Sequence, residues 1–412
     1  MARVLLLIPT TSYRAKDFLD ATDAVGATAV VGSDQPQVLA DAAPGTSLAV
    51  DFHDIDASVA TIAAFHRDYP LDAIIPADEQ AAVLAAAASH ALNLDHSPTH
   101  AVQIAGNKHL LRQALAPAPV DSPAFTVLSV DDDPSKAARS VTYPCVLKPL
   151  SLSGSRGVLR ADGDNSFVEA FFRVKQIIED AGDRAGPDRD KILVEAYVPG
   201  IEVALEALLI DGELHPLALF DKPDPLEGPT FEETIYVTPS RLDDTTQGAV
   251  IAATSNAAKA IGLAQGPVHA ELRINDGGIW VIEVAARSIG GLCGRTLKFG
   301  AGLSLEEIIL RHALGLPQSD LDRGADASGV MMIPIPSGGV LASVGGQDAA
   351  RDVPGIEDVR ITIPDGQPVV PLPEGDKYLG FIFARGEDPA TVEAALRTAH
   401  AALEIKIDPA ES

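Results

Sequence analysis

The segment GPVHAELRINDGGIWVIEVAAR, residues 266–287, carries the clearest structural pattern in the sequence. Apolar and polar residues alternate on both sides of DGG, which is the pattern of a two-stranded β-hairpin. A three-residue loop, Asp276–Gly278, would use the glycines for positive φ and set Ile274 opposite Trp280 on an apolar face. A two-residue loop would set apolar residues against polar ones, which the pattern disfavours. The segment therefore predicts a hairpin with one apolar face.

Two glutamates, Glu271 and Glu283, lie opposite each other on the other face of this hairpin. Cross-strand neighbours have Cβ atoms about 5 Å apart, and like charges there are destabilising. Such a pair needs a proton or a cation between its carboxylates, and a hard divalent ion such as Mg²⁺ suits oxygen ligands. His269 and Arg287 project on the same face. A solvated polar face explains the spacing equally well, so both alternatives stay open at this point.

A second segment, YPCVLKPLSLSGSRGV (residues 143–158), ends an apolar strand in Lys148 and continues into a loop of serines and glycines. The N–H groups of such a loop can form a concavity that binds anions, and glycine lets the backbone approach closely. Lys148 and the loop from Ser153 to Gly157 would then hold phosphate. The alternative is a surface strand with one stray lysine.

Lys108 follows Asn107, a good helix N-cap, and lies in the first turn of a helix. The helix dipole disfavours a cation there, so Lys108 is either a solvated lysine or one aimed at an anion. In KILVEAYVPGIEVALEALLIDG (residues 191–212) a strand ends at Glu195, a turn follows, and a second strand carries Glu202. Such an apolar strand edge can hold adenine, with Glu202 accepting from ribose hydroxyls; an ordinary hairpin with solvated acids is the alternative.

Three sections differ in pattern along the chain. Residues 1–105 alternate apolar strands with helical segments, which predicts a parallel, Rossmann-like α/β domain. No GxGxxG follows the first strand, which disfavours a dehydrogenase. Residues 106–318 carry the segments above, with a flexible lid over about 140–210, and residues 319–412 predict a small α+β domain.

Composition excludes several classes of protein. The 412-residue chain has a net charge of −27, which repels nucleic acid. Its first apolar run is too short for a signal peptide or a membrane span. The two cysteines, Cys145 and Cys293, fit no metal or disulfide spacing and indicate a reducing compartment. We therefore expect a cytoplasmic protein with no nucleic-acid or membrane partner.

The ordered set of motifs resembles the ATP-grasp superfamily over nearly the whole chain. The set is Lys108, VLKP with Lys148, the Ser/Gly loop, VEAYVPGIE, HAEL and IEVAAR. No single motif is specific, but their order is. Within the superfamily the chain is most similar to carboxylate–amine ligases of the L-amino acid ligase type. The resemblance implies an ATP-grasp fold with mixed α/β and α+β domains: an N-terminal Rossmann-like domain and a small C-terminal α+β domain.

The resemblance also implies roles for individual residues, with ATP and Mg²⁺, or Mn²⁺ in its place, as cofactors. The ATP-binding residues would be Lys108, Lys148, Ser153, Gly154, Ser155, Gly157, Glu195, Ala196, Val198 and Glu202. The metal ligands would be Glu271 and Glu283, and the catalytic residues Arg287, Lys148 and Glu283. The substrate-binding residues would be Lys222, Glu233, Tyr236, His269, Arg287, Gly290 and Arg295. Most relatives place Asn where this chain has Ala285, which leaves the number of ions, one or two, open.

The activity implied by the resemblance is ATP-dependent formation of an amide or peptide bond. A carboxylate, expected to be that of an amino acid, would take the γ-phosphate of ATP, and an amine would displace phosphate from the acyl phosphate. Related enzymes imply a homodimer. Two alternatives stay open: another ATP-grasp enzyme, such as a biotin carboxylase-like or purine-pathway ligase, and a protein that binds nucleotide without catalysis.

Overall fold

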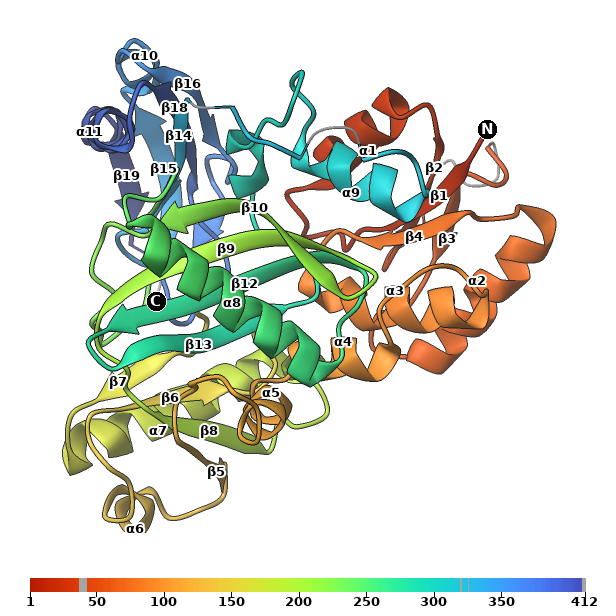
Figure 1. Cartoon of the computed structure of the whole chain (residues 1–412). Helices are drawn as coiled ribbons and strands as arrows, with labels where there is room; N and C mark the ends of the chain where they lie inside the picture. Colours follow the sequence, from red (N-terminus) through yellow and green to blue (C-terminus); the bar gives the residue numbers. More distant parts are fainter. Residues whose placement is uncertain (37–42, 319–320, 325, 410–412) are drawn as a thin grey trace.

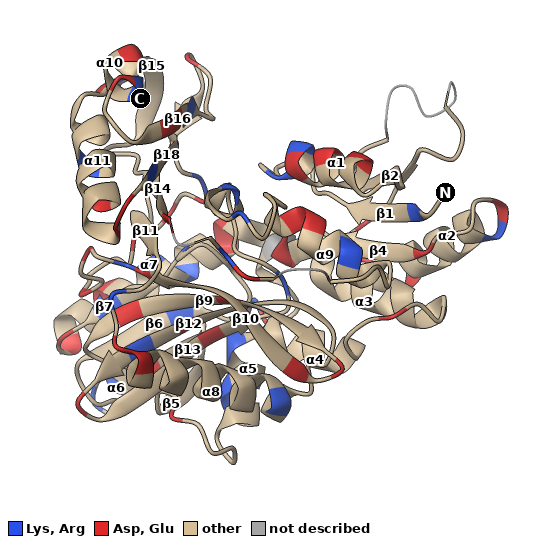
Figure 2. Ribbon diagram, turned by 45° about the horizontal axis from the view of Figure 1, so that its top comes forward, with Lys and Arg blue, Asp and Glu red and all other residues tan. Residues whose placement is uncertain are grey.

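The structure is a computed structural model that describes residues 1–36, 43–318, 321–324 and 326–409, without the side chains of residues 183 and 184. Figure 1 shows an N-terminal domain, a lid and a C-terminal domain arranged around a central sheet. Among the described residues, no helix has the length and apolar character needed to cross a lipid bilayer. Acidic residues are spread over all the domains rather than gathered on one element (Figure 2).

The N-terminal domain is a parallel α/β unit, as its alternating pattern predicts. Its four strands pair in the order β3-β2-β1-β4, and every pairing is parallel. Helices follow the strands in the chain and pack against them. The elements are β1 (Arg3–Leu7), α1 (Ala15–Ala24), β2 (Thr28–Ser33), β3 (Ser47–Ala49), α2 (Ile55–Asp68), β4 (Ala73–Pro76), α3 (Glu79–Ala91) and α4 (Thr99–Ala105).

The lid is a separate antiparallel sheet of order β5-β8-β6-β7, reached through helix α5 (Lys108–Leu115). Helix α7 packs its apolar face on this sheet around Phe167 and Phe171. The predicted lid bounds, 140–210, are wrong at the far end, because residues 201–210 form a central strand of the large sheet. The lid elements are β5 (Phe125–Ser129), α6 (Pro134–Ala138), β6 (Cys145–Pro149), β7 (Leu159–Ala161), α7 (Asp164–Ala181), η1 (Gly182–Ala185) and β8 (Lys191–Ala196).

The large sheet has eight strands in the order β13-β12-β9-β10-β11-β14-β18-β16. The sheet crosses the predicted domain boundary at residue 318, because β11 before it pairs with β14 after it. Residues 319 and 320, at the start of the predicted third domain, lie outside the described residues. Its elements are β9 (Ile201–Ile210), β10 (Glu213–Asp221), β11 (Ile235–Thr238), α8 (Asp244–Ile261), β12 (Gly266–Asn275), β13 (Gly278–Ala285), η2 (Cys293–Thr296), α9 (Leu305–Ala313), β14 (Ala327–Ile333), β16 (Ile356–Ile361) and β18 (Gly380–Gly386).

The C-terminal domain adds a smaller sheet of order β17-β15-β19 and two helices to the far end of the large sheet. Helix α11 packs on β14 and β18. The remaining elements are β15 (Gly339–Gly345), α10 (Gln347–Arg351), β17 (Pro368–Val369), α11 (Pro389–Ala401) and β19 (Glu404–Asp408). The predicted α+β domain is therefore present, and it shares a sheet with its neighbour.

Strand β9 lies at the centre of the molecule because it is covered on both faces. Ala204 and Leu208 pack into a core that includes the N-terminal domain, whereas Val203 and Leu205 pack into the core beneath α8. A strand buried on both faces reads as a continuous apolar run, which is how residues 203–209 read apart from Glu206. The contacts that Glu206 makes at the candidate active site explain why a charged residue occupies this buried strand.

The hairpin of β12 and β13 confirms the pairing of its glutamates but not the predicted turn. Asn275 pairs with Gly278, so the loop has two residues, and Trp280 lies opposite Arg273 instead of Ile274. A β-bulge between the turn and the glutamates then absorbs one residue, and Glu271 lies opposite Glu283. Bulges of this kind re-aim side chains next to functional sites.

Candidate active site

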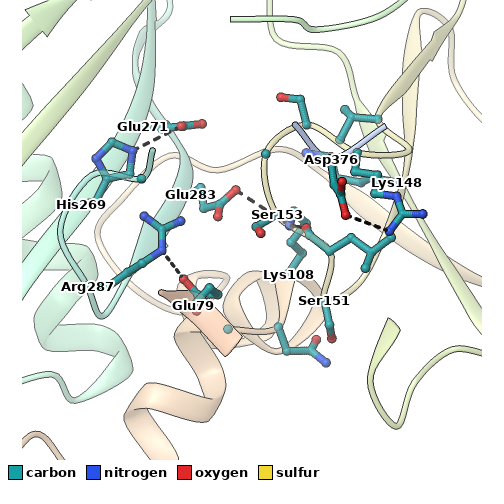
Figure 3. A pocket seen from close by; sticks show the side chains of 18 of the residues that line it. Glu79, Lys108, Lys148, Ser151, Ser153, His269, Glu271, Glu283, Arg287 and Asp376 are labelled. Atoms are coloured by element: carbon teal, nitrogen blue, oxygen red, sulfur yellow. Dashed lines mark hydrogen bonds and ion pairs between the residues drawn. The ribbon is translucent and has the colours of Figure 1, made fainter. Parts of the chain in front are cut away.

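A cavity of about 1020 Å³ lies where the N-terminal domain, the lid, the large sheet and the C-terminal domain meet. Ligand pockets usually measure about 300–1000 Å³, so this one has room for a nucleotide and a second small molecule. Predicted site residues that line it are Lys108, Lys148, Ser153, Gly154, Ser155, Glu195, Ala196, Val198, Glu202, Glu233, Tyr236, His269, Glu271, Glu283, Arg287 and Gly290. Figure 3 shows carboxylates and cations converging on it from several elements.

The hairpin carboxylates form the floor of the cavity. Glu283 lies 3.9 Å from the Nζ atom of Lys108, and Glu271 lies 3.4 Å from His269 (Figure 3). Glu271 also lies 3.4 Å from Lys222. Burial opposes ionisation of Glu271, but Lys222 and His269 hold the pKa of this carboxyl well below its usual range. The cavity therefore presents an ionised Glu271 beside the carboxylate of Glu283.

Lys148 ends strand β6 inside the cavity, as the sequence predicts, and it is held by a buried carboxylate. Glu195 Oε2 lies 2.6 Å from the Lys148 Nζ atom, while Glu195 Oε1 accepts from Arg112 Nε at 2.7 Å. Burial lowers the pKa of Lys148, and Glu195 opposes this effect. Arg112 also donates to the carbonyl of Ile282 at 2.6 Å, next to Glu283. Arg112 thus connects Glu195, the partner of Lys148, to the bulge of the hairpin.

The flap, defined here as Ser151–Gly157, connects β6 to β7 and lines the cavity through its first six residues. Lys108 donates to the carbonyl of Leu152 at 2.7 Å. Gly154 and Gly157 have positive φ, and a Cβ atom at Gly157 would lie 2.8 Å from Pro149. The glycines are therefore required by backbone conformation and, at Gly157, by close packing.

Another side of the cavity, which the sequence analysis assigned to adenine, is formed where β8 leaves the lid sheet. The N–H of Ala196 donates to Ala124 at 2.8 Å, and the carbonyl of Val198 accepts from Arg273 at 2.8 Å. Glu202 is paired through both oxygens, with Lys222 at 2.8 Å and with Arg273 at 2.7 Å. A ribose hydroxyl that donates to Glu202 would be its third partner, beside Lys222 and Arg273.

Arg287 follows β13 and is held by the N-terminal domain. Its Nε atom lies 2.7 Å from Glu79 Oε2, at the start of α3 (Figure 3). Burial opposes the charge of Arg287, but Glu79 and Glu283 raise its pKa. The carboxyl end of β4 thus contributes to the site, as expected for a parallel α/β unit.

His269 lies between two carboxylates. Its Nδ1 atom contacts Glu206, and its Nε2 atom lies 3.4 Å from Glu271. Burial lowers the pKa of His269, but Glu206 and Glu271 together raise it to about 9, so the ring is protonated at neutral pH. Glu206 also accepts from the N–H of Ile289 at 2.9 Å. Glu206 of strand β9 therefore fixes both His269 and the loop after Arg287.

Lys222 occupies the centre of an acidic cluster formed by Glu202, Glu233 and Glu271. Oxygens of the three carboxylates lie within 4.8 Å of one another, and Lys222 pairs with each of them. Burial opposes the charge of Lys222, but the carboxylates raise its pKa well above its usual value. Its Nζ atom also lies 5.1 Å from the ring centre of Tyr236. Lys222 itself does not line the cavity, so its neighbours, not its ammonium, face a ligand.

Arg295 is not at the cavity, contrary to the expectation that it holds a substrate carboxylate. Its guanidinium makes a two-pronged contact with Asp17 of α1, with NH2 donating at 2.8 Å. Gly157 also lies outside the lining, and Ala285 is fully buried and offers no side-chain oxygen. Arg295 therefore joins the N-terminal domain to the rest of the molecule.

Four residues at the site received no specific role from the sequence: Glu79, Arg112, Glu206 and Asp376. Glu79 follows a buried parallel strand, and Glu206 interrupts a continuous apolar run, so both carried a signal. Arg112 shares one helix face with Lys108, four residues earlier. Asp376 comes from the C-terminal domain, and no local pattern points to its contact with the lid.

Three family models match successive parts of the chain. The ATP-grasp N-terminal domain matches residues 19–96, the ATP-grasp domain matches residues 141–296, and the L-amino acid ligase C-terminal domain 2 matches residues 331–408. The chain belongs to the ATP-grasp superfamily. Its C-terminal domain and the set of matches place it among the carboxylate–amine ligases of that superfamily.

Two curated proteins and one solved structure are similar to the chain over half of its length or more. Protein y4rH of Sinorhizobium fredii is 22% identical over 99% of this chain and 84% of its own length. An alanine–anticapsin ligase of Bacillus subtilis is 26% identical over 62% of this chain and 57% of its own length, so the chain matches little more than half of that enzyme. The fold matches the crystal structure of L-amino acid ligase from Bacillus licheniformis with a TM-score of 0.83 and 24% identity, covering 99% of both chains.

Proposed function

We propose that this protein is an ATP-dependent carboxylate–amine ligase that joins amino acids, or an amino acid and another amine, through an acyl phosphate. The observation that supports this most is the arrangement of charges in one cavity. Lys108, Lys148 and Arg287, from three different parts of the chain, line the same cavity as Glu271 and Glu283. Phosphoryl transfer demands mainly positioning and neutralisation of charge, which this set can supply.

The residues present fit a divalent cation and a nucleotide. Glu271 and Glu283 offer carboxylate oxygens from neighbouring strands, which are ligands that Mg²⁺ and Mn²⁺ accept. Because Ala285 offers no oxygen, a second ion would depend on water or on the substrate. A bound ion would neutralise phosphate charge. Lys108, Lys148 and the flap would hold the phosphates, residues 195–198 the adenine, and Glu202 the ribose.

The reaction divides into two balanced steps. A substrate carboxylate oxygen attacks the γ-phosphorus of ATP in line, the bond to the β-γ bridging oxygen breaks, and ADP leaves. The resulting acyl phosphate is then attacked by an amine, which loses a proton as inorganic phosphate departs. Arg287 and Lys148 would neutralise the charge that develops in the first step. The flap would exclude water, which otherwise hydrolyses the acyl phosphate.

The amino-acid side of the proposal rests on the residues around the acidic cluster. Burial, together with the charge of Glu271, raises the pKa of Glu233 to about 7, although Lys222 opposes the shift. An incoming ammonium group beside Glu233 would favour its ionised form. Tyr236, His269 and Gly290 would complete the substrate wall. The homodimer and the cytoplasmic location stay predictions.

Release of phosphate from MgATP tests the proposal. Purified protein is assayed alone, with pooled L-amino acids and with bicarbonate. We expect release only with amino acids, together with a new amide detected by mass spectrometry. Glu283→Gln should lower this turnover about 100- to 1000-fold, as loss of one well-placed group that stabilises charge does. Release with bicarbonate alone would point to a carboxylase, and binding of ATP without turnover under any condition would point to a non-catalytic protein.

A further inference from the structure

The flap touches the C-terminal domain as well as the cavity. The N–H of Gly157 donates to the carbonyl of Pro373 at 2.9 Å, and Arg156 Nε donates to the carbonyl of Glu374 at 3.0 Å. These residues lie more than two hundred positions apart in the chain. The loop between β17 and β18 therefore supplies two backbone acceptors to the segment that covers the phosphate end of the cavity.

Two ion pairs reinforce this contact. Arg173, on helix α7 of the lid, binds Glu374 through both Nε and NH2, the latter at 2.9 Å. Such two-pronged pairs between arginine and carboxylate fix orientation as well as add energy. The hydrogen bond from Arg173 lowers the pKa of Glu374. Asp376, which lines the cavity, lies 4.0 Å from Arg156 (Figure 3). One short loop thus holds both the flap and the helix behind it.

The loop itself is a tight turn that is suited to this role. The N–H of Gly375 donates to the carbonyl of Pro371 at 2.9 Å. A Cβ atom at Gly375 would lie 2.0 Å from the carbonyl oxygen of Val370, so no other residue fits without moving the backbone. The turn therefore presents Glu374 and its neighbours on a support that does not depend on the lid.

We propose that residues 373–376 of the C-terminal domain are a catch that holds the flap closed over the nucleotide, with Glu374 as the positioning residue. The carboxylate of Glu374 acts through Arg173, while its backbone carbonyl accepts from Arg156, and Glu374 touches no reacting atom. The proposal rests on the proposed function for what the closed flap protects, which is the acyl phosphate. A weakened catch lets water reach this intermediate, so ADP forms without amide.

The test uses variants of an exposed pair, which should not disturb folding. Glu374→Gln removes the charge and keeps the shape, and the double variant Arg173→Glu with Glu374→Arg exchanges the partners. The control is Lys175→Gln, because Lys175 lies on the same helix and pairs with Asp131 within the lid, at 3.3 Å. Amide hydrogen exchange of residues 151–158 is measured on the full chain with Mg²⁺ and a non-hydrolysable ATP analogue.

The catch predicts about two- to fivefold faster exchange of the flap in Glu374→Gln, as loss of a partly exposed ion pair allows, with no change in the control. The exchanged pair should restore slow exchange. In turnover assays the ratio of ADP to amide should rise in Glu374→Gln. In the double variant with exchanged partners, this ratio should return to that of the unaltered protein. Exchange in Glu374→Gln equal to that of the unaltered protein, or no rescue by the exchanged pair, would overturn the proposal.

This design separates failure of the catch from failure of the proposed function. Hydrogen exchange with the analogue requires nucleotide binding but no ligation. If hydrogen exchange of the flap is faster in Glu374→Gln and no amide forms with any amino acid, the catch is supported and the proposed amino acid ligase activity is contradicted. If amide forms and hydrogen exchange of the flap is the same in Glu374→Gln as in the unaltered protein, the ligase activity is supported and the catch is contradicted.

Discussion

Lys148 and Lys222 are both buried lysines beside one cavity, yet their surroundings shift their pKa values in opposite directions. Burial lowers the pKa of Lys148 more than Glu195 raises it, since Glu195 also pairs with Arg112 and the charges of Arg112 and Lys108 lower it further. Burial acts on Lys222 as well, but three carboxylates surround it and raise its pKa well above the usual value. The balance between burial, neighbouring carboxylates and neighbouring cations therefore sets the direction of each shift.

This difference indicates what each lysine does. The charge of Lys148 is only partly matched by Glu195, so a phosphate in the cavity would find an unfilled partner. Three carboxylates surround the charge of Lys222, and Lys222 is not among the residues that line the cavity. We therefore expect Lys148 to act in the chemistry and Lys222 to hold together the wall that carries Glu271.

Replacing Lys222 should have the largest effect on stability. Lys222→Met leaves Glu202, Glu233 and Glu271 buried without their shared cation. Removing one partner of a buried ion pair costs about 3–5 kcal/mol, so the urea midpoint of unfolding should fall by a corresponding amount. Lys222→Arg keeps the charge and serves as the control. An unchanged midpoint in Lys222→Met would mean that the cluster is held by something other than this lysine.

Replacing Lys148 should affect catalysis more than stability. In Lys148→Met, Glu195 keeps Arg112 as a partner, whereas a phosphate loses its cation. We expect kcat for phosphate release to fall about 100- to 1000-fold, as for loss of one preorganised group that stabilises transition-state charge. A variant that unfolds like Lys222→Met while it retains its turnover would break the comparison between the two lysines.

The pH dependence of kcat/KM for ATP sharpens the account of Lys148. Activity that needs charged Lys148 falls as pH rises through its lowered pKa. Because Glu195 raises the pKa of Lys148, Glu195→Gln should move this alkaline limb to lower pH. The limb should stay in place in Glu374→Gln, whose side chain is not among the influences on Lys148. A limb that moves to higher pH in Glu195→Gln would exclude Lys148 as the group that titrates.

Replacing Arg295 should have the smallest effect. Arg295→Ala removes its contact with Asp17, and such a partly exposed pair contributes about 0.2–1 kcal/mol to stability. The KM for every substrate should stay unchanged, because Arg295 does not line the cavity. A KM for one amino acid that rises tenfold or more would return Arg295 to the substrate site.

Local sequence patterns predicted the N-terminal parallel α/β domain and the facing pair of Glu271 and Glu283, because alternation fixes which face of a strand is buried. Most other residues that line the cavity were named from the resemblance to the ATP-grasp superfamily. The patterns did not predict the turn at Asp276 and Gly277, since the bulge that corrects the register has no separate signal. Glu271 and Glu283 were paired correctly only because the bulge cancels the error in the turn.

Contacts between distant residues could not be predicted in the same way. Arg112 meets Glu195 across 83 positions, and Arg295 meets Asp17 across 278. Periodicity shows that a charged residue faces inward, but it does not identify the partner. Arg295 was for this reason assigned to a substrate, when its charge is matched by a carboxylate of another domain.

Transfer of oxygen from substrate to phosphate tests the central claim most directly. Amino acids labelled with ¹⁸O in their carboxylates are incubated with the protein and MgATP, and the released phosphate is examined by mass spectrometry. If the carboxylate attacks the γ-phosphate, each phosphate released by amide formation carries one ¹⁸O atom, and Lys148→Met forms almost none. Phosphate without ¹⁸O, in the presence of every labelled amino acid, would contradict an acyl phosphate of an amino acid as the intermediate.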